Sequence, residues 1–136
     1  MATVTLTKDN FEDVVTSNEI VFVDFWASWC GPCRQFAPIF EQSSEKHGDI
    51  VFGKIDTEDQ QELAGAFGIQ SIPTLMIFRD QIAVFGQPGA LPSEALETLV
   101  TQVRELDMDA VRAAVAEHEH SHDHDHDHSH DHDHTH

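Results

Sequence analysis

The chain holds two cysteines, separated by two residues in the segment Trp29-Cys30-Gly31-Pro32-Cys33. This segment follows an apolar run typical of a buried strand and precedes a predicted helix. At a helix N-terminus, unpaired N–H groups and the positive end of the helix dipole stabilise a thiolate. Cys30 is therefore the candidate nucleophile of a thiol–disulfide exchange. Cys33, one helical turn later, is placed to attack the mixed disulfide that Cys30 would form, closing a Cys30–Cys33 bond.

Two structural interpretations of the cysteine pair compete with this one. The pair could be half of a zinc site, but a closed structural site needs four ligands, and no second Cys pair or Cys/His pair lies in the part of the sequence expected to fold. The pair could also form a purely structural disulfide. A bond that closes so short a loop constrains the unfolded chain very little. Both considerations favour a reversible dithiol.

Length and composition predict one folded domain with a tail. The 136 residues are 40% apolar, enough for a core, and we expect a domain over residues 1–116 and a disordered tail over 117–136. The net charge is −18, and residues 1–116 alone carry 18 carboxylates against seven bases. This acidity disfavours nucleic acid as a partner.

The N-terminal sequence predicts a cytoplasmic location. It lacks a charged start followed by an apolar stretch, so no signal peptide is expected, and no apolar run approaches the length needed to span a membrane. We therefore expect no membrane partner. In a reducing compartment, a close cysteine pair is more often catalytic than structural.

Strand and helix patterns alternate along the chain, which predicts an α/β three-layer domain. Period-2 patterns and continuous apolar runs predict strands over 3–6, 20–25, 50–55, 74–78 and 82–85, the last two forming a hairpin. Helical spacing predicts helices over 10–16, 32–47 and 58–67, and a last helix from Pro92 through Leu106. Gly68 should end the third helix.

Three motifs in this order of elements closely resemble the thioredoxin family over residues 2–108: Val23-Asp24-Phe25-Trp26-Ala27, Trp29-Cys30-Gly31-Pro32-Cys33 and Ile72-Pro73-Thr74. The resemblance implies a thioredoxin-like α/β/α fold, with a mixed central sheet flanked by helices and the dithiol at its edge. It also implies a monomer that reduces protein disulfides in electron transport and cell redox homeostasis. Electrons would come from NADPH through a thioredoxin reductase, and the dithiol chemistry would need no cofactor. The Gly31-Pro32 dipeptide resembles that of the reducing members of the superfamily.

An acid interrupts the strand that leads to the dithiol. Asp24 lies six residues before Cys30 in an apolar run, so burial should raise its pKa. By resemblance, Asp24 helps to deprotonate Cys33, and Lys54 matches a family lysine that lies near this acid. The alternative is that Asp24 merely satisfies backbone groups.

A contact surface around the dithiol is implied by the same resemblance. In the family, the proline corresponding to Pro73 follows a cis peptide bond and faces the dithiol, leaving the preceding backbone free to pair with an extended substrate. The implied surface comprises Trp29, Gly31, Pro32, Ile72, Pro73 and Gly89. An ordinary turn proline is the alternative for Pro73. Arg79-Asp80-Gln81 and Pro88 depart from the family's usual hairpin turn and from its pattern beside Gly89.

Histidine occupies every second position at the end of the chain, interleaved mainly with acids. Imidazole and carboxylate ligands suit zinc, nickel or copper. The candidate ligands are His118, His120, His122, His124, His126, His128, His130, His132, His134 and His136. A purification tag is the alternative explanation, although tags are usually uninterrupted histidine runs.

The sequence thus predicts a thioredoxin-type protein disulfide reductase with a metal-binding tail. A second hypothesis is a metal-buffering or metal-delivery module that uses the dithiol domain as a redox sensor or carrier. A third is a non-catalytic scaffold, which the complete set of motifs disfavours.

Overall fold

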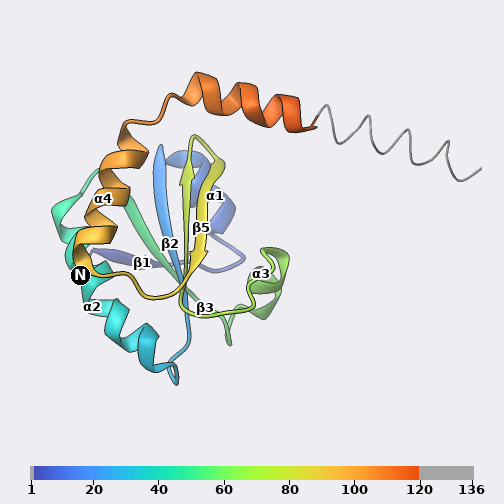
Figure 1. Ribbon diagram of the computed structural model, residues 1–136. Helices are drawn as coiled ribbons and strands as arrows, with labels where there is room; N and C mark the ends of the chain where they lie inside the picture. Colours follow the sequence, from blue (N-terminus) through green and yellow to red (C-terminus); the bar gives the residue numbers. More distant parts are fainter. Residues whose placement is uncertain (1, 120–136) are drawn as a thin grey trace, which may run out of the picture. The chain divides into compact units, whose positions relative to one another are not determined.

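The computed structural model describes residues 2–119, which divide after Arg104 into two compact units (Figure 1). Within the described residues, the first unit holds five strands and four helices. In chain order they are β1 (Thr3–Thr5), α1 (Phe11–Ser17), β2 (Ile20–Trp26), α2 (Gly31–Lys46), β3 (Val51–Asp56), α3 (Gln61–Ala66), β4 (Thr74–Arg79), β5 (Ile82–Pro88) and α4 (Ser93–Arg104).

The strands form one mixed sheet in the order β1-β3-β2-β4-β5. Strands β1, β3 and β2 run parallel, whereas β4 is antiparallel to both β2 and β5. Strand β2 is central, and its apolar side chains are buried on both faces of the sheet, as the continuous apolar run predicted.

Helices cover both faces of the sheet, which confirms the three-layer α/β/α architecture. Residues Ile20 and Phe22 of β2 pack in one cluster with side chains of α2 and α4. Val21, Val23 and Phe25 point to the other face, where α1 and the end of α3 contribute. Figure 1 shows α2 and α4 on one side of the sheet and α1 and α3 on the other. Asp24 is in step with Phe22, so it lies on the face that α2 covers.

Two predicted helix bounds are wrong, one because of a distant contact and one because of a local turn. Helix α4 ends at Arg104, so Leu106 is outside it; the Arg79 guanidinium donates hydrogen bonds to the carbonyls of Val103 (2.6 Å) and Arg104 (3.2 Å), which satisfies the end of the helix. Helix α3 begins at Gln61 rather than at residue 58, because the Asp56 carboxylate accepts the N–H of Glu58 and holds a turn there (3.0 Å).

Left-handed backbone conformations mark two chain reversals. Asp80 (φ 51°) and Gln81 (φ 71°) form the two-residue turn between β4 and β5, the conformation that Asn-Gly pairs usually supply. Gly68 adopts φ 65° just after α3, which agrees with its predicted role as a helix terminator.

The second unit is described as far as residue 119 and contains a helix over residues 108–119. The Asp107 carboxylate begins this helix by accepting the N–H groups of Asp109 (3.1 Å) and Ala110 (3.2 Å). The predicted tail starts at residue 117, so its first three residues belong to the helix, and residues 120–136 lie outside the described residues. Among residues 2–119, every helix is too short or too polar to cross a membrane.

Candidate active site

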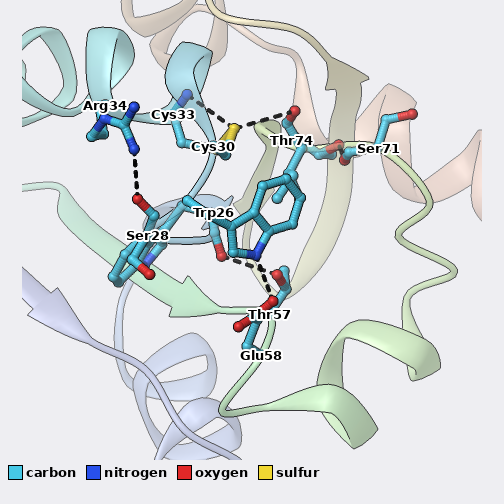
Figure 2. Close-up of a disulfide and its surroundings, with 11 residues drawn as sticks. Trp26, Ser28, Cys30, Cys33, Arg34, Thr57, Glu58, Ser71 and Thr74 are labelled. Carbon is cyan, nitrogen blue, oxygen red and sulfur yellow. Dashed lines mark hydrogen bonds between the residues drawn. A yellow bond between two sulfur atoms is a disulfide. The ribbon is translucent and has the colours of Figure 1, made fainter.

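The dithiol lies where β2 passes into α2, at the carboxyl ends of the parallel strands. Cys30 is the N-cap of α2, and the N–H of Cys33 donates to its Sγ atom at 3.2 Å. The two cysteines are buried and joined by a disulfide, with their Cα atoms 5.2 Å apart (Figure 2). Pro32 occupies the first turn, where its missing N–H breaks no helical bond.

This position gives the Cys30 sulfur an electropositive environment. When the disulfide is reduced, the Cys33 N–H and the positive end of the 16-residue helix α2 both favour a thiolate at Cys30. The sequence-based expectation that Cys30 stands at a helix N-terminus is confirmed.

Asp24 is a fully buried acid on the face of β2 that α2 covers. Its exposed fraction is 0%, and desolvation raises its pKa to about 7 despite the opposing effect of the Lys54 ammonium. Neither carboxylate oxygen has a hydrogen-bond partner within the described part of the chain. Asp24 therefore accepts no hydrogen bond from a backbone N–H group of the described residues, and the alternative that it satisfies backbone groups is wrong.

Lys54 lies beside Asp24 in the sheet, but its ammonium contacts an aromatic ring. The two residues are register partners in the parallel pair β2–β3. The Nζ atom of Lys54 lies 5.0 Å from the ring centroid of Trp26, a cation–π arrangement. Trp26 in turn packs against the cluster that contains Cys30 and Cys33. Lys54 is thus linked to the surroundings of the dithiol through Trp26.

Two segments distant in sequence, Ile72–Pro73 and Gly89, lie near the dithiol and near each other. The carbonyl oxygen of Ile72 lies 3.8 Å from Cys30 Sγ, and the Ile72–Pro73 peptide bond is cis. The N–H of Gly89, which follows β5 with φ 109°, donates to the Pro73 carbonyl at 2.7 Å. The fold therefore brings the Ile72–Pro73 segment to Cys30 and Gly89 to Pro73, whereas a role of these residues in contacting substrate stays a prediction.

Trp29 stands out from this surface, with 63% of its area exposed. Its indole Nε1 donates a hydrogen bond to Glu58 Oε2, from the loop between β3 and α3. Sequence reasoning missed Glu58, because an exposed acid 29 residues away carries no local signal of such a contact.

Metal ligands were predicted only in the tail, and of those ten histidines the structure describes His118 alone, in the helix over residues 108–119. Within residues 2–119, no three His, Cys, Asp or Glu side chains are grouped so that they could hold a metal ion. The cysteine pair is therefore not part of a zinc site formed by the described residues. His47 is paired with Glu97, Nε2 to Oε1, at 2.7 Å.

Comparisons with known proteins agree with this geometry. The thioredoxin family model matches residues 2–102. "Putative thioredoxin 2" of Streptomyces coelicolor is 64% identical over 116 residues, covering 85% of this chain and 87% of the relative. A thioredoxin of Bacillus subtilis is 43% identical over 103 residues, covering 75% and 98% of the two chains. Among solved structures, a mutant thioredoxin from Halobacterium salinarum superposes with a TM-score of 0.72 at 34% identity, covering 76% of this chain and 92% of that chain.

Thioredoxins exchange a dithiol for a disulfide without a bound cofactor, and they generally work with thioredoxin reductase and disulfide-containing substrates. The Cys30–Cys33 pair supplies the redox centre for such a thiol–disulfide oxidoreductase. Sequence similarity, the mixed sheet and the disulfide at the start of α2 agree, and this chain belongs to the thioredoxin family.

Proposed function

We propose that the protein reduces disulfides of other proteins and is itself reduced by an NADPH-fed thioredoxin reductase. The observation that carries the proposal is the Cys30–Cys33 disulfide at the start of α2, over the sheet face that holds a buried acid, Asp24, with a pKa of about 7. A reductase needs both a stabilised thiolate and a group that can take a proton near neutral pH.

The first step forms a mixed disulfide. The Cys30 thiolate attacks one sulfur of the substrate disulfide, the S–S bond of the substrate breaks, and the departing substrate sulfur takes a proton. The Cys33 N–H, 3.2 Å from Cys30 Sγ, stabilises the thiolate before the attack.

The second step closes the disulfide seen in the structure. Asp24 accepts the Cys33 proton, and the resulting thiolate attacks Cys30 Sγ and expels the second substrate thiolate. With a pKa of about 7, the Asp24 carboxyl has both protonation states populated at neutral pH, so it can take this proton and later return it to solvent. Lys54, the register partner of Asp24, favours the charged form of the acid.

Substrates bind as an extended segment beside Cys30. The Ile72 carbonyl next to Cys30 Sγ offers a backbone acceptor, and exposed Trp29 offers an apolar contact. Backbone pairing of this kind reads little sequence, which suits a broad range of disulfide substrates. Gly31, Pro32, Pro73 and Gly89 complete the contact surface.

The test is turnover of a protein disulfide by the full-length chain with NADPH and a thioredoxin reductase. Cys30→Ser should abolish turnover, whereas Cys33→Ser should still attack and accumulate a covalent mixed disulfide that mass spectrometry detects. A Cys33→Ser chain that turns over normally, or a wild-type chain without any turnover, contradicts the proposal.

We propose a separate role for the His/Asp-rich tail, which is to bind zinc, nickel or copper in a cytoplasmic protein. Alternating imidazoles and carboxylates from residue 118 onward support it. Truncation after Glu119 keeps the helix over residues 108–119 and removes nine of the ten histidines. Calorimetric titration with zinc should then lose its binding signal while disulfide reduction persists; unchanged zinc binding contradicts the role. Metal inhibition of turnover that depends on the tail would show that the tail and the dithiol are coupled.

A further inference from the structure

The backbone that leads into Trp29 is held in place by hydrogen bonds at two carbonyls. Thr57 donates from both its N–H (2.8 Å) and its hydroxyl (3.0 Å) to the Trp26 carbonyl. The Arg34 guanidinium donates to the Ser28 carbonyl, directly before Trp29, at 2.8 Å. Figure 2 shows these contacts around the dithiol. The main chain that carries Trp29 therefore has a defined position.

The indole of Trp29 is not fixed in the same way by packing. With 63% of its surface exposed, it has few neighbours to restrict its rotamers. Its hydrogen bond to Glu58 restrains it. Glu58 is itself anchored, because its N–H donates to the Asp56 carboxylate (3.0 Å) at the end of β3. The acceptor for the indole thus sits on a defined loop.

We propose that Glu58 is a positioning residue that holds the Trp29 indole ready for substrate beside Cys30. The inference rests on the proposed function, because it assigns Trp29 to the surface that meets the substrate. A free indole must be immobilised when substrate binds, which weakens binding, whereas a tethered one has already lost that freedom. The Glu58 carboxylate accepts its hydrogen bond from Trp29 and not from a cysteine, so the exchange step itself should not depend on it.

Three single variants of the full chain distinguish the effect of the Trp29–Glu58 hydrogen bond from the effect of the negative charge of Glu58. Glu58→Ala removes both the acceptor and the charge. Glu58→Gln removes the charge but keeps an amide oxygen that can accept from the indole. Asp59→Ala removes a charge from the next residue, whose carboxylate contacts Gln60 rather than Trp29. Each variant is assayed for kcat and KM with a protein disulfide, and for indole mobility by tryptophan fluorescence anisotropy, with Trp29→Phe defining the contribution of Trp26.

We expect Glu58→Ala to raise KM by about 3- to 10-fold, the effect of losing one hydrogen bond, with little change in kcat. It should also lower the anisotropy of the Trp29 emission, while Glu58→Gln and Asp59→Ala stay near the wild-type values. An unchanged KM in Glu58→Ala overturns the proposal, as does a Glu58→Gln or Asp59→Ala chain as impaired as Glu58→Ala, because charge would then be the cause. Absence of turnover in the wild-type chain would refute the proposed function, and the anisotropy would still test the tether.

Discussion

Replacing Asp24 with asparagine should remove a loss of stability that the wild-type chain suffers as pH rises. The folded chain raises the pKa of this carboxyl from 3.8 to about 7, chiefly through desolvation. Between these values the unfolded chain has released the proton and the folded chain still binds it, so this group makes the free energy of unfolding fall as pH rises. The loss begins near pH 4 and is complete above about pH 7.

The size of the effect follows from the same two pKa values. A difference of about three pH units corresponds to about 4 kcal/mol, at about 1.4 kcal/mol for each unit. No discount for solvent is needed, because the side chain is 0% exposed. Asparagine cannot ionise, so the unfolding free energy of Asp24→Asn should not fall with pH for this reason. Burying its amide adds an offset of either sign that does not change with pH.

The assay is urea unfolding of the oxidised wild-type and Asp24→Asn chains at half-unit steps from pH 4 to pH 8.5. Oxidation removes the titration of Cys30 and Cys33, and subtracting one chain from the other removes the titration of groups they share. The difference in unfolding free energy should grow steadily in favour of Asp24→Asn up to about pH 7 and then level off. A difference that stays constant from pH 4.5 to pH 7 would refute the reasoning.

Three further predictions concern stability. Gly53→Ala should lower the free energy of unfolding by about 1–3 kcal/mol in urea melts, because its Cβ would lie 2.7 Å from Cγ of buried Leu6. Gln81→Gly should raise it by about 1 kcal/mol, because glycine adopts the positive φ of this turn without strain; a thermal melt that shows a loss would contradict this. The hydrogen bonds from Arg104 lower the pKa of Asp49 to about 2, so this ion pair stabilises the fold above about pH 4 and the contribution disappears as pH falls through 2. Since Asp49 is largely exposed, Asp49→Asn should cost at most about 1 kcal/mol at pH 7 and nothing at pH 1.5, as urea melts at the two pH values would show.

The sequence alone was sufficient for the features that depend on neighbouring residues. An apolar run interrupted by Asp24, followed by two cysteines with a proline between them in the first turn of a helix, predicted a strand, a buried acid and a dithiol, and the fold contains each of them. These features follow from local periodicity and from the way a helix begins, so they leave a pattern in a short stretch of chain.

The tertiary structure decided the features that join distant segments. The bond between Trp29 and Glu58, the Lys54 ammonium over the Trp26 ring and the end of α4 at Arg79 link residues at least 24 positions apart. A contact between two distant segments does not depend on the hydrophobic pattern around either residue, so the neighbouring sequence does not reveal it. The local sequence therefore determined that a dithiol lies at the start of a helix. Only the packing of distant segments around the dithiol decided which groups surround it.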